Sequence, residues 1–302
     1  MSKSRPNHKR SGCWKVLPSV IVLGGMFWVC SLFISHKRPT VECEQMLTVL
    51  TYNTHQMGMY EKAHQNRVIK YLQRQDADII CLQEVDVYKN DKYLTLPELR
   101  KALSKYPYTY FDFKIYNKRH QYGLAVFSKY PLLNKNTIRY SSRGNISNYC
   151  DVAVGKDTLR LFNNHLESNR LELKDFPDSI DSDALKESAQ RISDKLGSAR
   201  KIRHEQAAAI RAEIDNSPYP VIVTGDFNAI PLSYTYLKLR GWDLHDCFLE
   251  TSVGKWGATL TKRQLGIRID YILCAKNLKP VSMRIDRVNY SDHYPVTATI
   301  GW

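Results

Sequence analysis

Cysteine is scarce in this chain, with 7 among 302 residues. That number is too small for a scaffold built on disulfides, and because it is odd, at least one thiol has no partner within the chain. With 14 glycines and 12 prolines the chain is not collagen-like, and with 43% hydrophobic and 25% charged residues it is not a disordered chain. No repeat period and no boundary between two folded domains stands out, so the composition predicts one globular unit with a sizeable core.

Acidic residues are absent from the first 38 residues, which hold seven lysines and arginines. Half of the formal net charge of +14 therefore lies in this short segment. The other half is spread over the rest of the chain, where a basic balance favours anionic ligands without identifying one.

Charged residues are also absent from residues 16–35. Twenty uncharged residues are enough, as a helix, to cross a hydrocarbon core of roughly 30 Å. Because five bases precede this run and two follow it, the positive-inside rule predicts a single-pass membrane protein with a cytoplasmic N-terminus and a periplasmic or extracellular domain. The alternatives are a cleaved signal peptide and an anchor inserted the other way. The predicted organisation is a basic tail (1–15), a transmembrane helix (16–35), a linker (36–46) and a folded domain (47–302).

Apolar runs in the rest of the chain predict many short strands and two clear helices. Hairpin-like spacings outnumber strand–helix–strand units, so we expect a two-sheet α/β sandwich with helices outside the sheets rather than a parallel barrel. Helices are expected at 61–75 and 200–214, and strands at 47–52, 79–85, 108–113, 123–128, 150–154, 158–166, 221–228, 239–248, 258–263, 267–274, 281–288 and 296–300.

Polar residues stand at the ends of several of these apolar runs. Each has an ordinary structural explanation, since asparagine and aspartate are common turn residues and a single histidine is usually just hydrogen-bonded. As a group, however, they supply what phosphate-ester hydrolysis requires. The residues are Asn53, Glu84, His165, Asp226, Asn228, Asp270, Asp292 and His293.

Three of these side chains offer oxygen ligands for a metal. A hard cation such as Mg²⁺ prefers carboxylate and carbonyl oxygens and keeps water molecules that a phosphate can displace. Glu84, Asp292 and the amide of Asn53 are the candidates for that site.

The other side chains fit the acid–base and charge requirements of the same reaction. Asp226 is a candidate for taking the proton from an attacking water, and the amide of Asn228 for donating to a phosphoryl oxygen. Asp270 could fix the tautomer of His293 and favour its cationic form, which would face the negative charge of the transition state.

Six runs of the chain, in this order, resemble the endonuclease/exonuclease/phosphatase family typified by deoxyribonuclease I. They are LTYN (50–53), LQEVD (82–86), NNHLES (163–168), GDFNAIP (225–231), RIDYIL (268–273) and SDHYPV (291–296). The resemblance implies a four-layer α/β sandwich in which two central mixed β-sheets are flanked by helices. It also implies a hydrolase that depends on Mg²⁺, with Mn²⁺ as the alternative, and that cleaves phosphodiesters or phosphomonoesters.

The family's functional positions carry over onto matching residues of this chain. Glu84 corresponds to the principal metal ligand, with Asn53 and Asp292 close to the ion. Asp226 corresponds to the residue that activates water, and the resemblance further implies that Asn228 positions the phosphate and that Asp270 pairs with His293.

His165 matches the family position that contacts the phosphate or protonates the leaving group. In the deoxyribonuclease-like pattern an acid lies just before the strand GLAVFS, whereas this chain has Lys-Arg-His-Gln at 118–121. The resemblance therefore leaves the acid partner of His165 open, and we expect Tyr122 or Arg119 to reach the substrate instead.

The substrate is less well determined than the chemistry. The chain lacks the arginine after GDFN and the Cys-Asp-Arg motif of inositol polyphosphate 5-phosphatases, which disfavours that subfamily. Residues 167–203 form an insertion that is acidic in its first half and carries Arg200, Lys201 and Arg203 at its end, where nucleic acid would be attracted. A surface excursion without function is the alternative.

The function expected from the sequence is an exported, Mg²⁺-dependent phosphodiesterase or endonuclease. The expected partners are a phosphate-ester substrate (nucleic acid, lipid head group or small metabolite) and the membrane, through the N-terminal helix; no protein partner can be inferred. The alternatives are a phosphomonoesterase, a sphingomyelinase-like lipid phosphodiesterase, and a catalytically silent phosphate-binding domain.

Overall fold

The computed structural model describes most of the predicted folded domain and little before it. Apart from Gly25, the predicted tail and transmembrane helix lie outside the described residues. No helix of the described part is both long enough and apolar enough to cross a membrane. This finding contradicts the predicted localisation as a single-pass membrane protein with a periplasmic or extracellular domain. The described residues are 25, 42–58, 61–140, 142, 144–170, 175, 182–252, 257–261 and 266–302.

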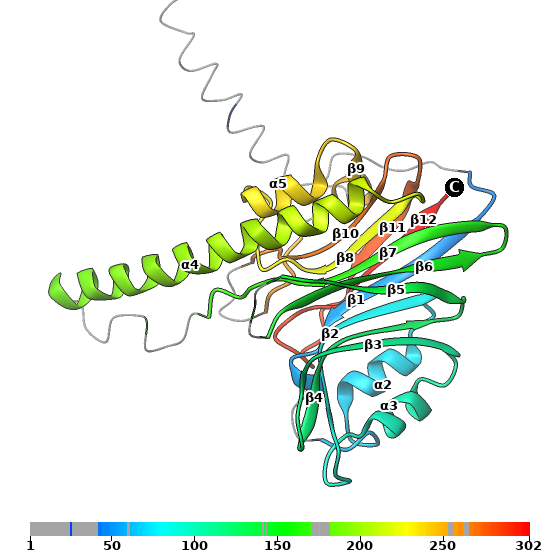
Figure 1. Ribbon diagram of the computed structural model, residues 1–302, viewed down its shortest axis with the longest axis horizontal. Coiled ribbons are helices and arrows are strands. Elements are labelled where there is room, and N and C mark those ends of the chain that lie inside the picture. Colours follow the sequence, from blue (N-terminus) through cyan, green and yellow to red (C-terminus); the bar gives the residue numbers. More distant parts are fainter. Residues whose placement is uncertain are drawn as a thin grey trace, which may run out of the picture.

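Two six-stranded sheets form the centre of the molecule (Figure 1). The first contains, from edge to edge, β11 (Lys279–Ile285), β12 (Val296–Gly301), β1 (Met46–Asn53), β2 (Ile79–Tyr88), β4 (His120–Ser128) and β3 (Tyr108–Tyr116). The second contains β5 (Leu132–Ile138), β6 (Ile146–Val154), β7 (Asp157–His165), β8 (Val221–Asp226), β10 (Asp270–Ala275) and β9 (Leu244–Asp246).

Both sheets are mixed, as the sequence predicted. The pairs β1–β2 and β7–β8 are parallel, and the other neighbouring strands are antiparallel. Each sheet thus has one central parallel pair, whose carboxyl ends point the same way.

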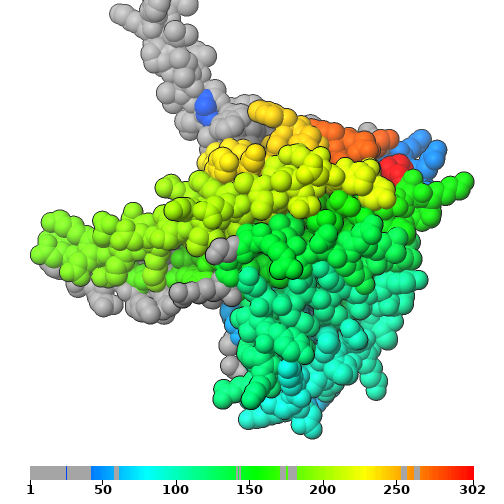
Figure 2. Space-filling view, viewed as in Figure 1, coloured from blue at the N-terminus to red at the C-terminus, as the bar shows by residue number. Residues whose placement is uncertain are grey.

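Helices cover the outer faces of the two sheets (Figure 1). The short helices α2 (Arg67–Arg74) and α3 (Leu96–Ala102) lie on the first sheet, and α4 (Ser182–Asp215) with α5 (Tyr234–Arg240) lies on the second. A further short helix, α6 (Cys247–Thr251), follows β9. Figure 2 shows that the first part of α4 projects well beyond the sheets. These layers confirm the predicted four-layer α/β sandwich.

The core consists of three apolar layers. The middle layer joins the facing sides of the two sheets, with Val49 and Cys81 from the first and Leu161 and Cys274 from the second. Cys81 and Cys274 are completely buried and serve as small core residues, and the five cysteines of the described part are all free thiols.

Some element boundaries differ from the sequence prediction for local reasons. The helix expected at 61–75 begins only at residue 67, because the side chain of Asn66 accepts a hydrogen bond from the Ile69 amide and caps it there. The strand expected at 239–248 is instead the end of α5, β9 and the start of α6. Gly241, with φ of 55°, ends α5, and the carboxylate of Asp246 caps α6.

The 167–203 insertion contains the amino-terminal part of one long helix. The sequence predicted a helix at 200–214, whereas α4 extends back to residue 182. Its first turns are mostly exposed, so they lack the apolar periodicity by which a helix is recognised in a sequence.

Candidate active site

The ends of the two parallel strand pairs bring most of the predicted site residues to one edge of the sandwich. Asn53 ends β1 opposite Gln83 of β2, one residue before Glu84. His165 ends β7 directly opposite Asp226, which ends β8, and Asp226 is also paired with Asp270 at the start of β10. Residues far apart in the sequence are therefore fixed together by strand register.

Asp226 lies at the centre of this cluster and is 1% exposed. Its Oδ1 accepts from the backbone N–H of Asn228 at 2.8 Å. Its Oδ2 accepts from the side-chain amides of Asn53 at 3.0 Å and of Asn228 at 3.1 Å. The Nε2 atoms of His293 and His165 lie 3.8 and 3.9 Å from the same oxygen. The carboxylate is thus held rigidly, with two imidazoles facing it.

His293 and Asp270 form a buried pair beside Asp226. The Nδ1 of His293 lies 2.9 and 3.1 Å from the two carboxylate oxygens of Asp270. Asp270 is itself placed by its backbone N–H, which donates to the hydroxyl of Thr259 at 3.1 Å. This is the pairing that the resemblance implies, and it turns the Nε2 of His293 toward Asp226.

Burial and charge act in opposite directions on these two groups. Burial raises the pKa of Asp226 to about 6, although the nearby His293 and His165 oppose that shift. Burial also lowers the pKa of His293, but the carboxylates of Asp270 and Asp226 outweigh it and raise this pKa to about 10. At neutral pH the site therefore contains an imidazolium next to an ionised carboxylate that is poised to accept a proton.

Glu84 reaches the cluster from a distorted part of β2. It has a φ of 53°, and the register of β2 against β4 shifts between Leu82 and Val85. The hydroxyl of Thr54 accommodates this conformation by donating to the carbonyl oxygens of Gln83 and Glu84. A positive φ is costly for a residue other than glycine, and such strain is concentrated at functional sites.

The side chain of Glu84 is 19% exposed and borders both sheets. Its Oε1 accepts from the amide of Asn53 at 3.2 Å and lies 3.5 Å from the Nε2 of His165. One oxygen of Glu84 therefore contacts both Asn53 of β1 and His165 of β7, at the surface of an otherwise buried cluster.

Asp292 joins the site from the loop before β12. The hydroxyl of Ser291 donates to the carbonyl oxygen of Asn53 at 2.8 Å, which fixes this loop to the end of β1. The carboxylate of Asp292 is 17% exposed and lies 3.3 Å from the Nδ1 of His55. His55 was not among the predicted site residues; it contacts Asp292 only because of the tight turn after β1.

The donor atoms at this edge fit a divalent cation. Asp226, Asp270 and His293 have ligand atoms within 4.8 Å of one another, but all three are buried and Asp270 and His293 are committed to each other. Glu84 and Asp292, by contrast, keep part of their carboxylates open to solvent next to Asn53. Oxygen donors with room for water suit a hard cation such as Mg²⁺ better than a closed pair does.

Tyr122 and Arg119, both predicted to reach the substrate, differ in their placement. Tyr122 lies in β4 opposite Asp86. Its pKa is raised by burial and by the negative charges of Glu84, Asp86 and Asp226, which places it beside the cluster. Arg119 lies in the exposed turn before β4, where its side chain makes no hydrogen bond or ion pair with the cluster in the described part of the chain.

His165 meets acids through one ring nitrogen. Its Nδ1 makes no hydrogen bond with any described residue, whereas its Nε2 faces Glu84 and Asp226. The histidine that replaces the expected acid, His120, pairs instead with Asp86, with 2.7 Å between Nδ1 and Oδ1. The sequence prediction missed this second histidine–aspartate pair, which joins strands β2 and β4.

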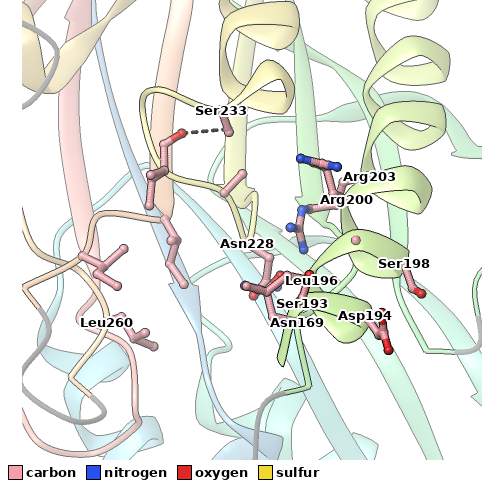
Figure 3. Close-up of a pocket in the computed structure, with 15 residues that line it drawn as sticks. Asn169, Ser193, Asp194, Leu196, Ser198, Arg200, Arg203, Asn228, Ser233 and Leu260 are labelled. Carbon is pink, nitrogen blue, oxygen red and sulfur yellow. Dashed lines mark hydrogen bonds between the residues drawn. The ribbon is translucent and has the colours of Figure 1, made fainter. Parts of the chain in front are cut away.

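A cleft of about 950 Å³ extends from Asn228 along α4 (Figure 3). Its lining includes Arg200 and Arg203 of α4 and the apolar Ile267 and Ile269. Arg203 is only 7% exposed, whereas the sequence grouped it with surface bases. Its spacing from the buried Ala207 and Ile210 of the same helix is the signal that could have revealed this burial.

Gly225 fixes the position of Asp226, and its replacement tests that link. It has a φ of 124°, and a Cβ would lie 2.0 Å from the carbonyl oxygen of Asn164 on β7. We expect Gly225→Ala to lower the free energy of unfolding by at least about 2 kcal/mol, as measured by urea unfolding. The cost of the strained φ and the cost of pushing β7 and β8 apart both contribute to this loss.

Gly155→Ala is the matched control for this substitution. Gly155 also has a positive φ, of 59°, but the nearest atom to a new Cβ is a flexible side-chain oxygen 3.7 Å away. Gly155→Ala should lower the free energy of unfolding only by the backbone strain, which is about 1–2 kcal/mol. Equal costs for the two variants would show that β7 and β8 are not held together tightly at Gly225.

The chain and its fold match known proteins. The profile of the Endonuclease/Exonuclease/phosphatase family matches residues 50–293. Comparison with curated proteins gives no match. Among solved structures, the endonuclease/exonuclease/phosphatase from Beutenbergia cavernae is 16% identical, with a TM-score of 0.59 over 85% of this chain and 72% of that one.

Two further solved structures share this fold. A D. rerio TDP2 humanized by 14 mutations is 16% identical, with a TM-score of 0.60 over 85% of this chain and 99% of that one. Sphingomyelinase C from Streptomyces griseocarneus is 20% identical, with a TM-score of 0.57 over 84% of this chain and 99% of that one. At such identities the likeness shows the fold alone, but together with the match over residues 50–293 it shows that this chain belongs to the endonuclease/exonuclease/phosphatase family of hydrolases that act on phosphate esters.

Proposed function

We propose that this phosphoesterase is a divalent-metal-dependent phosphodiesterase or endonuclease that hydrolyses its substrate by in-line attack of water. The observation that carries the proposal is the placement of Asp226. A single buried carboxylate oxygen receives two amide donors, from Asn53 and Asn228, and faces the Nε2 of His293 at 3.8 Å. A carboxylate with a pKa of about 6 in such a position is suited to general-base work.

In this mechanism Asp226 takes a proton from the attacking water at Oδ2. Asn228 keeps the bond of 2.9 Å to the carbonyl oxygen of Leu166, and its second N–H turns from Asp226 to a phosphoryl oxygen when substrate binds, which also frees Oδ2 to accept the proton. The imidazolium of His293 offsets the negative charge that develops on the phosphorus centre, and Asp270 keeps it charged and correctly turned.

Glu84, Asn53 and Asp292 would hold the metal, which we expect to be Mg²⁺ or Mn²⁺. When bound, the ion supplies Lewis-acid stabilisation of a phosphoryl oxygen. Asn53 also orients Glu84 and Asp226 through one side-chain nitrogen. The partly exposed Glu84 and Asp292 leave room for the remaining ligands to come from water and substrate.

His165 and Tyr122 are proposed to contact the substrate rather than to transfer protons. No described acid contacts the Nδ1 of His165, whereas its Nε2 faces the site and can donate to the phosphate. Burial beside carboxylates raises the pKa of Tyr122, so its hydroxyl stays protonated and available as a donor. The role of Arg119 remains a prediction of the sequence.

The test of this proposal is plasmid nicking by the full-length protein with and without Mg²⁺, together with hydrolysis of a chromogenic phosphodiester. Metal-dependent nicking would identify an endonuclease. Cleavage of the small diester with an intact plasmid would favour a lipid or small-molecule diester, in line with a neighbour named as a sphingomyelinase. Inactivity on both would reject the diesterase and favour a phosphomonoesterase or a silent binding domain.

The proposed metal ligand Glu84 makes a separate prediction. In Glu84→Gln the amide keeps the shape but loses the negative charge, so the concentration of Mg²⁺ needed for half-maximal activity should rise by about tenfold or more. Titration of Mg²⁺ against initial rate measures this shift. An unchanged Mg²⁺ requirement, with a lower maximal rate, would show that Glu84 does not bind the ion.

A further inference from the structure

Arg203 of α4 is a buried cation that lines the cleft. It is 7% exposed, and its Nη1 donates to the backbone carbonyl oxygen of Glu167 at 2.7 Å. No carboxylate of the described residues forms an ion pair with it. The carboxylate of Glu167 is already engaged, by Arg170 at 2.7 Å and by Ser142 at 2.8 Å. Burial lowers the pKa of Arg203, and the nearby charges of Asp226 and Glu167 offset that effect only in part.

This cation lies directly beside the catalytic cluster. Leu166 and Glu167 follow His165, and their two consecutive carbonyl oxygens accept from Asn228 at 2.9 Å and from Arg203 at 2.7 Å. Asn228 and Arg203 also line the same cleft (Figure 3). A group that extends along the cleft from Asn228 would therefore meet Arg203 next.

Arg200, one turn earlier on α4, adds a second cation to the same cleft. It is exposed and makes no ion pair or hydrogen bond with the described residues. The carboxylate among the described lining residues, Asp194, accepts from Gln190 at 2.9 Å. Two guanidinium groups that form no ion pair with a described carboxylate point to a missing anion on this side of the cleft.

The cleft also has apolar lining residues, namely Ile230, Leu260, Ile267 and Ile269, and Figure 3 shows Leu260 well apart from the two arginines. The cleft volume of about 950 Å³ is much larger than a single phosphate needs. An occupant that fills it must present negative charge toward α4 and carbon toward the isoleucines.

We propose that Arg203 and Arg200 form a subsite for a second phosphate group, so that the substrate carries another phosphate beside the ester that is cleaved. The organic part between the two phosphates lies against the apolar lining residues. This inference rests on the proposed function, because it takes the site at Asn228 as the place of the scissile phosphate. A guanidinium suits this role, since it offers several donors in one plane to a phosphate.

The experiment is calorimetric binding to the full-length protein, with and without Mg²⁺. The probes are thymidine 3′,5′-bisphosphate and the two thymidine monophosphates. We expect the bisphosphate to bind at least about tenfold more tightly than either monophosphate, the scale of a charge-assisted contact. Arg203→Gln and Arg200→Gln should each reduce this ratio. Arg191→Gln, on the same helix but paired with Glu187 and Ser188, should leave it unchanged.

Propane-1,3-diol bisphosphate separates the possible sources of the second phosphate. Tighter binding of the nucleoside bisphosphate would assign the site to a nucleic-acid strand, and equal binding would assign it to any closely spaced bisphosphate. Either result supports the subsite. A ratio near one in the parent protein, or a ratio that both cleft variants leave intact, would overturn it.

Two features of this design keep the outcomes distinct. Arg203→Gln removes a hydrogen bond to the carbonyl oxygen of Glu167 and could therefore destabilise the protein. Arg200 is exposed and makes no ion pair or hydrogen bond with the described residues, so Arg200→Gln tests the subsite without that risk. Binding does not require turnover. A protein that fails to nick plasmid or cleave a diester would therefore refute the proposed function while leaving the binding ratio to decide the subsite.

Discussion

Asp226→Asn is expected to lower kcat by about a hundredfold to ten-thousandfold, the range found when a general base is removed. The amide has nearly the same shape as the carboxylate, and its one oxygen can keep the bond from the backbone N–H of Asn228, although its nitrogen cannot accept from the side-chain amide of Asn53. It cannot take a proton from water, and it no longer faces His293 with a negative charge. Initial rates on the chromogenic diester at saturating Mg²⁺ measure the effect.

The stability of this variant separates a catalytic effect from misfolding. Removing the buried charge of Asp226 stabilises the folded protein, because that charge is costly to desolvate. Removing its attraction to His293 destabilises the protein, and because the two effects oppose each other we expect only a small change in Tm. Asp151→Asn is the control. Asp151 is also fully buried and pairs with Arg160, so its replacement should lower Tm and leave kcat nearly unchanged. A kcat for Asp226→Asn within tenfold of the parent value would reject Asp226 as the base.

The site residues that lie close together in the sequence were the most predictable. In GDFN, the conformation of Gly225 and the turn at Asn228 fix the distance between Asp226 and Asn228 within three residues. Their arrangement needs no knowledge of the tertiary structure. The pairing of Asp270 with His293 spans 23 positions, and it was expected from the chemistry that the two side chains offer and from the resemblance to a known family rather than from local geometry.

Other features depend on packing that the sequence does not encode locally. The burial of Arg203 is set by how α4 lies on the second sheet, and the contact of His55 with Asp292 depends on left-handed backbone after β1. The edge strand β5 was not predicted, because most of its residues are exposed and polar. The helix α3 was also missed, although a capping box between Thr95 and Glu98 marks its start.

The histidine–aspartate pair leads to the second large effect. We expect His293→Ala and Asp270→Asn each to lower kcat/KM by at least about a hundredfold, because the first removes the imidazolium and the second removes the charge that sustains it. The kcat/KM of the double variant should lie within a few fold of that of His293→Ala. The four values of kcat/KM, measured on one diester at one Mg²⁺ concentration, form a double-mutant cycle.

Non-additivity in this cycle is the decisive result because the contacts of the Asp270 carboxylate lead to the substrate through His293. Its two oxygens both face Nδ1 and it is 1% exposed, so without the imidazole only its charge beside Asp226 is left to act on the site. If the two losses instead multiplied, to about ten-thousandfold, Asp270 would act independently of His293. In that case the alternative grouping of Asp226, Asp270 and His293 as metal ligands would gain support, and the Mg²⁺ requirement of Asp270→Asn would rise as that of Glu84→Gln is expected to do.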